Sequence, residues 1–412
     1  MANRRSFLQT LSTIPLIGTV CSTRAYASIE KGREKGREKG RDYFKELGVP
    51  PIVNACGNYT KFTASLMPRE VMQAMEYAST RYVRLNDLQD AVGARIATLV
   101  GSEAAMVSAG AASAISLGTA ACITGNNPDF IRRIPETSGM KSEVLIPKAH
   151  RNSYDHAIRA SGAKLIEVET ASELEKAIGP KTAMLAFFNL HEPAGPIKAA
   201  EFAAISKRYG IPALVDAAAD IPPIENLSKF SKLGFDLVCI SGGKAICGPQ
   251  SAGLLLGRRD LIEAAKLNTS PNSGSIHRGM KVNKEEILGM LVALETYLKR
   301  DHAGEEKEWE RRVAVIAAAA HTVEGVAAEL WVPPIASHLP HVKVRWDQAR
   351  ISSSVKDVIA ALREGDPSIE ANPDSTEGLI LATWTLKPGE EKIVAARLRA
   401  VLKSASQQVA AR

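Results

Sequence analysis

The stretch that decides the fold reads Asp236-Leu237-Val238-Cys239-Ile240-Ser241-Gly242-Gly243-Lys244, an apolar run that ends in two glycines and a lysine. After Gly248-Pro249-Gln250 comes a second apolar run, Gly253-Leu254-Leu255-Leu256-Gly257. Short continuous apolar runs bounded by turn residues are typical of strands buried on both faces. Because the link between the two runs is short, we expect this pair of strands to be antiparallel.

The lysine at the end of the first run has few charged neighbours in the sequence. Burial lowers the pKa of an amine, and an amine with a lowered pKa can form an imine with a carbonyl compound. A nucleotide-binding P-loop is excluded because Val238 and Ala245 stand where that motif needs Gly and Ser or Thr. A surface lysine in a loop is the ordinary alternative, but the glycines and the apolar run that flank Lys244 disfavour it.

Similar apolar runs recur along the chain and alternate with helical patterns, which predicts an α/β domain with a mostly parallel sheet. The expected strands are Val144–Ile146, Leu165–Val168, Ala183–Phe188, Ala213–Val215, Leu237–Ile240 and Gly253–Leu256. The expected helices are Pro68–Ala78, Leu88–Val100, Tyr154–Ala160, Ala171–Ile178, Ala199–Tyr209 and Lys284–Lys299. We assign residues 42–300 to this large domain and residues 301–412 to a smaller α+β domain.

Three further stretches carry candidate site residues. The run Ser108-Ala109-Gly110-Ala111-Ala112-Ser113 opens an expected helix with small residues, so its backbone N–H groups could hold a phosphate; tight helix packing is the alternative. Asp216 follows the expected strand Ala213–Val215, either as a helix cap or as the acid that keeps a pyridine nitrogen protonated. His150 follows Ile146-Pro147-Lys148-Ala149 and could stack on a planar ring, although a lone histidine is more often structural.

A small-residue anion site followed by a strand-end His, Asp and Lys, in this order, describes a pyridoxal phosphate (PLP) site of the aspartate aminotransferase fold, fold type I. The order is more specific than any of its parts. The order of these residues therefore predicts PLP as the cofactor, with His150, Asp216 and Lys244 as the residues that contact its ring and aldehyde.

The chain resembles the selenocysteine synthase (L-seryl-tRNA selenium transferase) family, in the branch that contains D-glucosaminate-6-phosphate ammonia-lyase. The motifs that carry the resemblance are Asn54-Ala55-Cys56-Gly57, Gly101-Ser102-Glu103-Ala104-Ala105, Ser241-Gly242-Gly243-Lys244, Gly248-Pro249-Gln250-Ser251 and Leu386-Lys387-Pro388-Gly389-Glu390. The resemblance implies PLP as a Schiff base on Lys244, Asp216 on the ring nitrogen and His150 near the ring.

The resemblance also implies contacts to phosphate and substrate. The stretch Ala109–Ser113, with Ser241, would hold the phosphate, and Arg278 and Lys281 would contact phosphate or substrate, in one reading across a dimer interface. The segment Lys61–Ser65 departs from the family pattern, and we expect it to border the active site.

As an activity, the resemblance implies a lyase that acts on an amino acid by α,β-elimination and releases ammonia, with Lys244 as Schiff-base lysine and general base. A selenium transferase-like or other PLP-dependent transferase is the alternative, and an amino-acid racemase is a further one. Arg95, Arg278 and Arg345 are candidates for the group that binds the substrate carboxylate. We expect a small-molecule substrate and a homodimer or a higher homo-oligomer.

Composition excludes several classes of protein. The 412 residues are 45% hydrophobic and 24% charged, as in a folded globular protein. Of the net charge of +7, residues 1–41 carry nine Lys and Arg against three Glu, a net of +6, so the remaining chain carries about +1 and nucleic-acid binding is not expected. The five cysteines and eight histidines contain no C-x-x-C and no H-E-x-x-H motif, so we expect free thiols and no metal site.

The first 27 residues read as an export signal. Arg4-Arg5 precede the apolar run Leu11–Val20 and the small-residue site Ala25-Tyr26-Ala27, a pattern that resembles a twin-arginine (Tat) signal. Pro15 interrupts a run that is already short for a bilayer, so stable membrane insertion is not expected. Residues 28–41 repeat Glu-Lys-Gly-Arg as a charged linker. The expected location is the periplasm, or the cytoplasm if the signal is not used.

Overall fold

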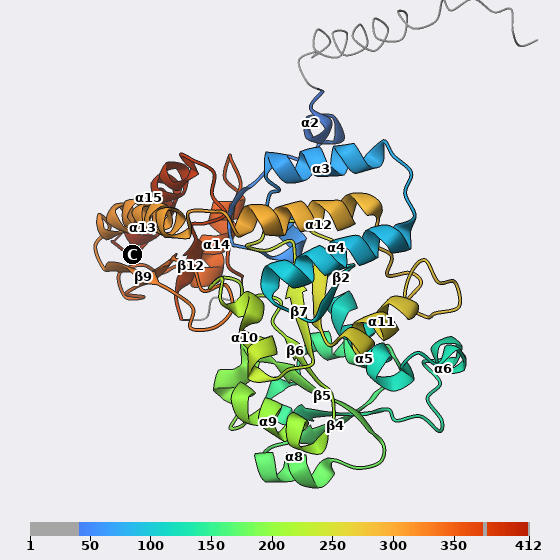
Figure 1. Ribbon diagram of the computed structural model, residues 1–412. Helices are drawn as coiled ribbons and strands as arrows, with labels where there is room; N and C mark the ends of the chain where they lie inside the picture. The colour runs from blue at the N-terminus through green and yellow to red at the C-terminus, as the bar shows by residue number, and fades with distance from the viewer. Residues whose placement is uncertain (1–40, 374–376, 411–412) are drawn as a thin grey trace, which may run out of the picture. The chain divides into compact units, whose positions relative to one another are not determined.

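The computed structural model of the chain describes residues 41–373 and 377–410 (Figure 1). The predicted export signal and nearly all of the charged linker lie outside the described residues. The chain divides into a short unit, Met1–Pro51, and a large unit, Ile52–Arg412. The described part of the short unit holds one helix, α2 (Tyr43–Leu47), whose first turn is capped by the Asp42 carboxylate at the N–H of Lys45.

A seven-stranded sheet forms the centre of the large unit, in the order β2-β8-β7-β6-β5-β3-β4 (Figure 1). All of its strands run parallel except β8, which is antiparallel to both of its neighbours. Its strands are β2 (Ala104–Ser108), β3 (Glu143–Pro147), β4 (Lys164–Val168), β5 (Thr182–Phe188), β6 (Ala213–Asp216), β7 (Leu237–Ser241) and β8 (Gly253–Gly257). The carboxyl ends of β3, β5, β6 and β7 therefore meet at one edge of the sheet.

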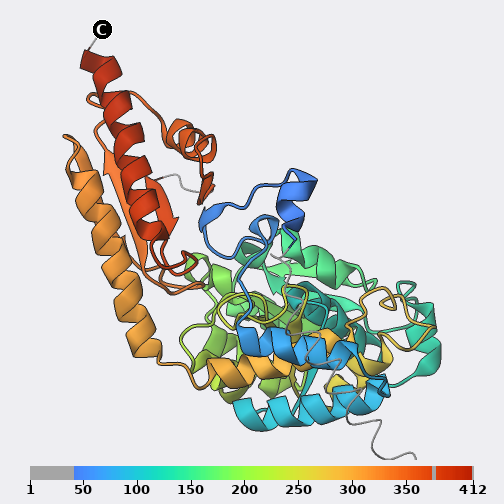
Figure 2. The ribbon, with the colours of Figure 1, turned by 90° about the horizontal axis from the view of Figure 1, so that it is seen from above.

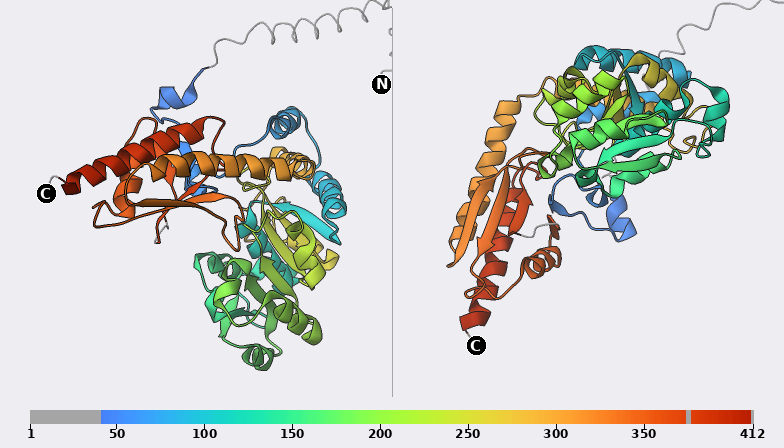
Figure 3. Two further views of the ribbon diagram at one scale, coloured as in Figure 1. Left: turned by 90° about the vertical axis from the view of Figure 1, so that its left-hand side faces the viewer. Right: turned by 90° about the horizontal axis from the view of Figure 1, so that it is seen from below.

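Two cores cover the two faces of this sheet, because successive side chains of a strand point to opposite sides. In β5, Leu185 and Phe187 pack into one core while Met184, Ala186 and Phe188 pack into the other. Helices contributing to the first core are α3 (Arg69–Ser79), α4 (Leu85–Val100), α8 (Ala171–Ala177), α9 (Ala199–Tyr209), α10 (Asn226–Leu233) and α12 (Lys284–Tyr297). Helices contributing to the second are α5 (Ala111–Thr124), α7 (His156–Arg159) and α11 (Arg259–Leu267), and Figure 3 shows the layers from two sides.

A third core lies in the C-terminal part, around an antiparallel sheet of order β12-β10-β9. Two long helices, α13 and α15, pack side by side against this part of the chain (Figure 2). The strand β1, from the segment before α3, pairs in parallel with β11 and adds Val53 and Ala55 to this core. The remaining elements are β1 (Val53–Ala55), α6 (Pro128–Arg133), α13 (His302–His321), β9 (Val326–Trp331), β10 (His341–Trp346), α14 (Val355–Arg363), β11 (Ile369–Ala371), β12 (Leu379–Ala382) and α15 (Glu390–Ala410).

The predicted α/β architecture with a mostly parallel sheet is confirmed, and so is the antiparallel pairing of β7 with β8. The stretch 154–160, expected as one helix, instead forms a 3-10 turn (Ser153–Asp155) followed by the short helix α7. The sequence analysis did not identify β2, whose alanines have no strand preference of their own. Burial of all five of its residues beside β8 and α4 holds this strand in the sheet.

Candidate active site

A cavity of about 500 Å³ opens at the carboxyl edge of the sheet, where β5, β6 and β7 end. Its wall includes Asp216 from the end of β6, Ser241 from the end of β7 and Lys244 from the following turn. Of the candidate residues, the structure brings these three together with Gly110, Ala111 and Ala112. The other lining residues are Thr60, Ile115, Asn152, Ser153, Tyr154, Phe188, Leu190, His191, Ala218, Ala219, Asp220, Gln250 and Ala336.

The two glycines before Lys244 are required by close backbone contacts. A Cβ on Gly243 would lie 2.6 Å from Cα of Gln250, and one on Gly242 would lie 2.8 Å from the carbonyl oxygen of Ala252. The N–H of Gly242 donates to that same carbonyl, and its own carbonyl accepts from the N–H of Gly248. The turn that carries Lys244 is therefore fixed by main-chain hydrogen bonds.

Burial lowers the pKa of Lys244, and the nearby carboxylates of Asp216 and Asp220 oppose this shift. For Asp216 the direction is reversed: burial raises the pKa of its carboxyl group, opposed by a hydrogen bond from the N–H of Ala218 at 3.0 Å and by Lys244. An amine that more readily loses its proton thus shares a cavity with a carboxyl group that more readily keeps one.

A second carboxylate in the wall, Asp220, was missed by the sequence analysis. It is 4% exposed, and burial raises the pKa of Asp220 to about 6, with a hydrogen bond from the Asn189 side chain acting in the opposite direction. The signal available in the sequence was a second acid four residues after Asp216, in the non-helical turn Asp216-Ala-Ala-Ala-Asp220 that follows β6. Ser337 N–H donates to the carbonyl of Ala219 at 2.7 Å and holds this turn from the C-terminal part.

The structure places His150 behind the cavity wall, and the histidine in the wall is His191. The His150 ring is fully buried edge-on against Phe187, and its Nδ1 accepts a hydrogen bond from the N–H of Phe188. Burial lowers the pKa of His150 to about 4, so the ring is neutral near pH 7. His191 lies 6.4 Å from it, centroid to centroid, in the 3-10 segment that follows β5.

The predicted phosphate-binding stretch opens α5, a 14-residue helix with no side-chain cap. Gly110 precedes it with φ of 87°, a conformation that favours glycine, and its first residues Ala111 and Ala112 line the cavity. Ala109 and Ser113 do not line it, but the Ser113 hydroxyl is buried and has no hydrogen-bond partner. Free N–H groups at a helix start and an unpaired hydroxyl beside them form a suitable anion site.

Arg278 is not at this cavity. It is exposed and lines a separate surface hollow together with Lys281. The other two candidate arginines do not line the cavity either. Arg95 pairs with Glu295, and Arg345 pairs with Glu329. Among the residues described, the wall of the cavity contains no arginine.

The segment Lys61–Ser65, which was expected to border the active site, contributes no residue to the cavity wall; the wall residue is Thr60, which directly precedes it. The Thr60 carbonyl accepts a hydrogen bond from the Gln250 side chain at 3.0 Å. Ser65 is anchored to the lysine turn, since its hydroxyl donates to the Gly243 carbonyl at 2.7 Å. The described residues hold no group of three or more His, Cys, Asp or Glu that could bind a metal ion, and none of their helices is long and apolar enough to span a bilayer.

The model of the L-seryl-tRNA selenium transferase family matches residues 54–353, nearly three quarters of the chain. The chain belongs to this family. It is also 29% identical to the D-glucosaminate-6-phosphate ammonia lyase of Salmonella typhimurium over 376 residues, which cover 88% of this chain and 98% of that protein.

Two solved structures extend the comparison. The structure of a D-glucosaminate-6-phosphate ammonia-lyase matches with a TM-score of 0.77 and 28% identity, over 89% of this chain and 99% of that one. A serine palmitoyltransferase with PLP matches with a TM-score of 0.54 and 14% identity, over 88% of this chain and 89% of that one. The predicted fold class, fold type I of the PLP enzymes, is thereby confirmed, and the family's relatives agree with the prediction of a lyase-type enzyme.

Proposed function

We propose that the chain is a PLP-dependent lyase that eliminates ammonia from an amino acid. The observation that carries the proposal is the shared wall of one cavity, where the largely buried amine of Lys244, the carboxyl of Asp216 and the uncapped start of α5 meet. The similarity to an ammonia lyase over almost its whole length supports the reaction class.

The residues of the cavity fit PLP. Lys244 would form the covalent link to the aldehyde, Asp216 would pair with the ring nitrogen, and the N–H groups of Ala111 and Ala112 with the Ser113 and Ser241 hydroxyls would hold the phosphate. The unpaired Ser113 hydroxyl and the free helix start are the groups that such an anion would satisfy. When bound, PLP would supply an electron sink for the bonding electrons released at Cα of the substrate.

Proton movement falls to the chain's own side chains. Because burial lowers the pKa of Lys244, its Nζ loses its own proton more readily, and the neutral amine can then accept a proton from the substrate and later return it. The carboxylate of Asp216 would stabilise a positive charge on the ring nitrogen of the cofactor. His191 lies in the cavity wall and would contact the ring, the role expected from the sequence for His150. The wall excludes bulk water on the side of Phe188 and Ile115.

A transferase acting on seryl-tRNA, as the family description names, is the second candidate. The chain outside residues 1–41 carries a net charge of about +1, whereas tRNA binding usually needs a strongly basic surface. This charge favours a small-molecule substrate.

We also propose that the protein acts as a homodimer or higher oligomer, and that residues 1–27 direct it to the periplasm. Support for export comes from Arg4-Arg5, the apolar run and the Ala25-Tyr26-Ala27 site. The surface hollow with Arg278 and Lys281 is a candidate contact to a neighbouring subunit.

The function is tested by screening D- and L-amino acids for release of ammonia and a keto acid. Lys244→Ala is expected to reduce turnover by at least about a thousandfold, because it removes both the covalent anchor and the base. Lys229→Ala, which changes an exposed lysine of α10 outside the cavity wall, is the matched control and should keep full turnover. Ammonia release that survives in Lys244→Ala would refute the assigned role.

A further inference from the structure

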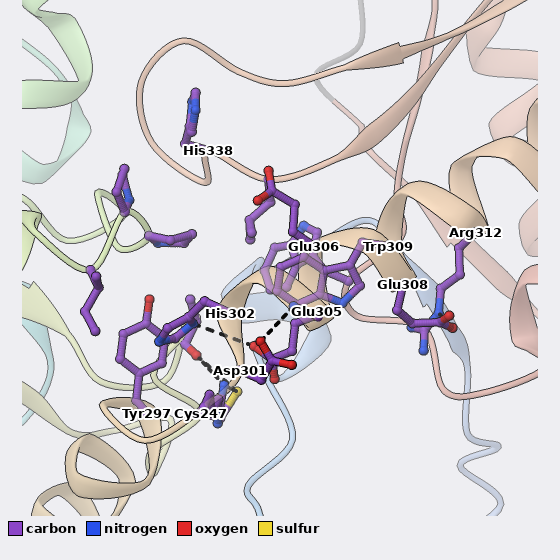
Figure 4. A pocket seen from close by; sticks show the side chains of 18 of the residues that line it. Cys247, Tyr297, Asp301, His302, Glu305, Glu306, Glu308, Trp309, Arg312 and His338 are labelled. Carbon is purple, nitrogen blue, oxygen red and sulfur yellow. Dashed lines mark hydrogen bonds and ion pairs between the residues drawn. The ribbon is translucent and has the colours of Figure 1, made fainter.

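A second cavity, of about 980 Å³, lies on the other side of the turn that carries Lys244. Lys244 itself lines the candidate active site, whereas Ala245 and Cys247 line the second cavity. The opposite wall comes from the start of α13, as Figure 4 shows. No residue lines both cavities, so they are distinct sites.

The second cavity is acidic. Its lining includes five carboxylates, from Glu225, Asp301, Glu305, Glu306 and Glu308, against two arginines. Glu225 and Glu306 are exposed at the rim and pair with no cation among the described residues.

Both arginines of the lining are already engaged. Arg300 donates to the carbonyl of Ala245 and stacks over the Tyr297 ring. Arg312 pairs with Glu308 and donates to the carbonyl oxygens of Thr383 and Leu386. The rim therefore presents negative charge that the protein does not neutralise.

Aromatic rings form the inner wall. Tyr297, Trp309 and Trp384 all line the cavity, and Figure 4 shows the first two with His302 beside the tyrosine. The faces of such rings attract cations, most strongly when the cation is shielded from water. An acidic rim above an aromatic wall is suited to an organic cation.

Three polar atoms of this wall are buried without a partner: the Tyr297 hydroxyl, Nε2 of His302 and Nε1 of Trp384. Tyr297 is only 2% exposed. The indole N–H of Trp384 can only donate, so a cation alone leaves it unpaired, and a ligand oxygen is needed. All three atoms are closed to solvent, so a ligand reaches them only if the side chains of the wall move.

We propose that this cavity binds a small organic cation that carries a hydroxyl group. The rim carboxylates of Glu225 and Glu306 attract the charge, and the rings of Trp309 and Trp384 contact the cationic group, because the Tyr297 ring is already covered by Arg300 and His302. The hydroxyl of the ligand pairs with the Tyr297 hydroxyl or with the indole N–H of Trp384. The volume is within the range of small-molecule sites. The proposal stands independently of the reaction at Lys244.

Calorimetric titration of the full chain with choline tests the proposal. Choline has a hydroxyl and a permanent charge but no N–H, so it cannot form an imine with an aldehyde in the other cavity. Its uncharged analogue 3,3-dimethylbutan-1-ol has nearly the same shape. We expect choline to bind at least about tenfold more tightly than this analogue. Equal affinities, or no saturable binding of choline, would overturn the proposal.

Variants locate the binding. Glu306→Gln is expected to weaken the affinity for choline by about three- to tenfold, because it removes a charge from the rim. Glu310→Gln, an exposed change on the same helix but outside the cavity, should keep the affinity within about twofold of the original. Equal effects of the two variants would place choline elsewhere and refute the assignment.

A separate variant tests the proposed contact between the ligand hydroxyl and Tyr297. Tyr297→Phe keeps the ring and removes one unpaired atom, so it should weaken choline while the affinity for tetramethylammonium, which has no hydroxyl, stays the same. Circular dichroism checks that the variant is folded. An unchanged choline affinity in folded Tyr297→Phe would contradict a hydroxyl contact at this residue.

Discussion

Lys244, Asp216 and Asp220 share one buried cavity, so each alters the charge state of the others. The two carboxylates favour the protonated amine, while burial disfavours it more strongly. For the two carboxyl groups burial is again the larger cause, and it raises both pKa values. In all three groups burial is the largest cause of the pKa shift, and it disfavours the charged form of each.

Asp220→Asn should stabilise the protein near neutral pH. Burial raises the pKa of Asp220 from 3.8 to about 6, so between these values the folded protein binds a proton that the unfolded chain has lost. Stability therefore falls as the pH rises through this window, and the full cost, up to about 3 kcal/mol, applies above it.

Thermal unfolding of the cofactor-free protein between about pH 4 and pH 8 measures this effect. The gain in Tm from Asp220→Asn should be largest near pH 7.5 and shrink toward pH 4. Glu76→Gln, an exposed change on α3 at a side chain with no ion pair among the described residues, is the control and should change the Tm little across this range. A gain that grows as the pH falls would contradict the account.

At the residue scale, the sequence singles out Asp216 because it ends the buried strand β6, and Lys244 because two glycines after β7 lead directly to it. His150 also follows a strand, but Phe187 and Gly195 pack against its ring and keep it out of the wall. His191 and Asp220 lie in turns several residues beyond β5 and β6, where apolar periodicity gives no direction for a side chain. Their placement depends on contacts such as Ser337 to Ala219, which join distant parts of the sequence.

Among the elements, α5 and β8 depend on each other. A Cβ on Gly253 of β8 would lie 2.6 Å from the carbonyl carbon of Gly110 and 2.8 Å from the N of Ala111, at the start of α5. The absence of a side chain at Gly253 thus permits the start of α5 to lie against the sheet. This contact positions the proposed phosphate site.

Gly253→Ala is therefore expected to displace the start of α5. We expect a loss of about 1–3 kcal/mol in stability and at least about a tenfold loss in PLP affinity, measured by thermal unfolding and by absorbance titration. Gly179→Ala is the control, because a Cβ there meets no atom within 4 Å. Unchanged PLP affinity in Gly253→Ala would show that the cofactor does not rest on α5.

The apolar patterns of the sequence were sufficient to predict the parallel sheet, but not to predict short strands that contain charged residues. The three residues of β11 include Glu370, a charged residue that is 6% exposed and is paired with Arg363. Such a strand lacks the apolar pattern by which strands are recognised, because a side chain from α14 neutralises it only in the folded protein.

At the scale of the whole molecule, the three cores begin at Val53 among the described residues, and the described residues 41–52 contribute nothing to them. The C-terminal core joins β1 with β11, so residues from both halves of the sequence contribute to it. Folding of the large unit should not require residues 1–41.

A chain that starts at Asp42 should keep its Tm within about 2 °C, because residues 1–27 read as a removable export signal and the Glu-Lys-Gly-Arg repeat has too few apolar residues to bury. It should also remain in the cytoplasm, as should the full chain with Arg4-Arg5 changed to Lys-Lys. Thermal unfolding and cell fractionation measure the two effects. Periplasmic delivery of the Lys-Lys variant would contradict export by a twin-arginine route.

The most direct test of the account is reduction of the purified, yellow protein with borohydride, followed by mass mapping of its peptides. We expect one cofactor-derived mass addition, on the peptide that contains Lys244, and none in Lys244→Ala. A colourless protein without bound PLP, or a label on a different lysine, would contradict the central claim that Lys244 and Asp216 enclose the cofactor.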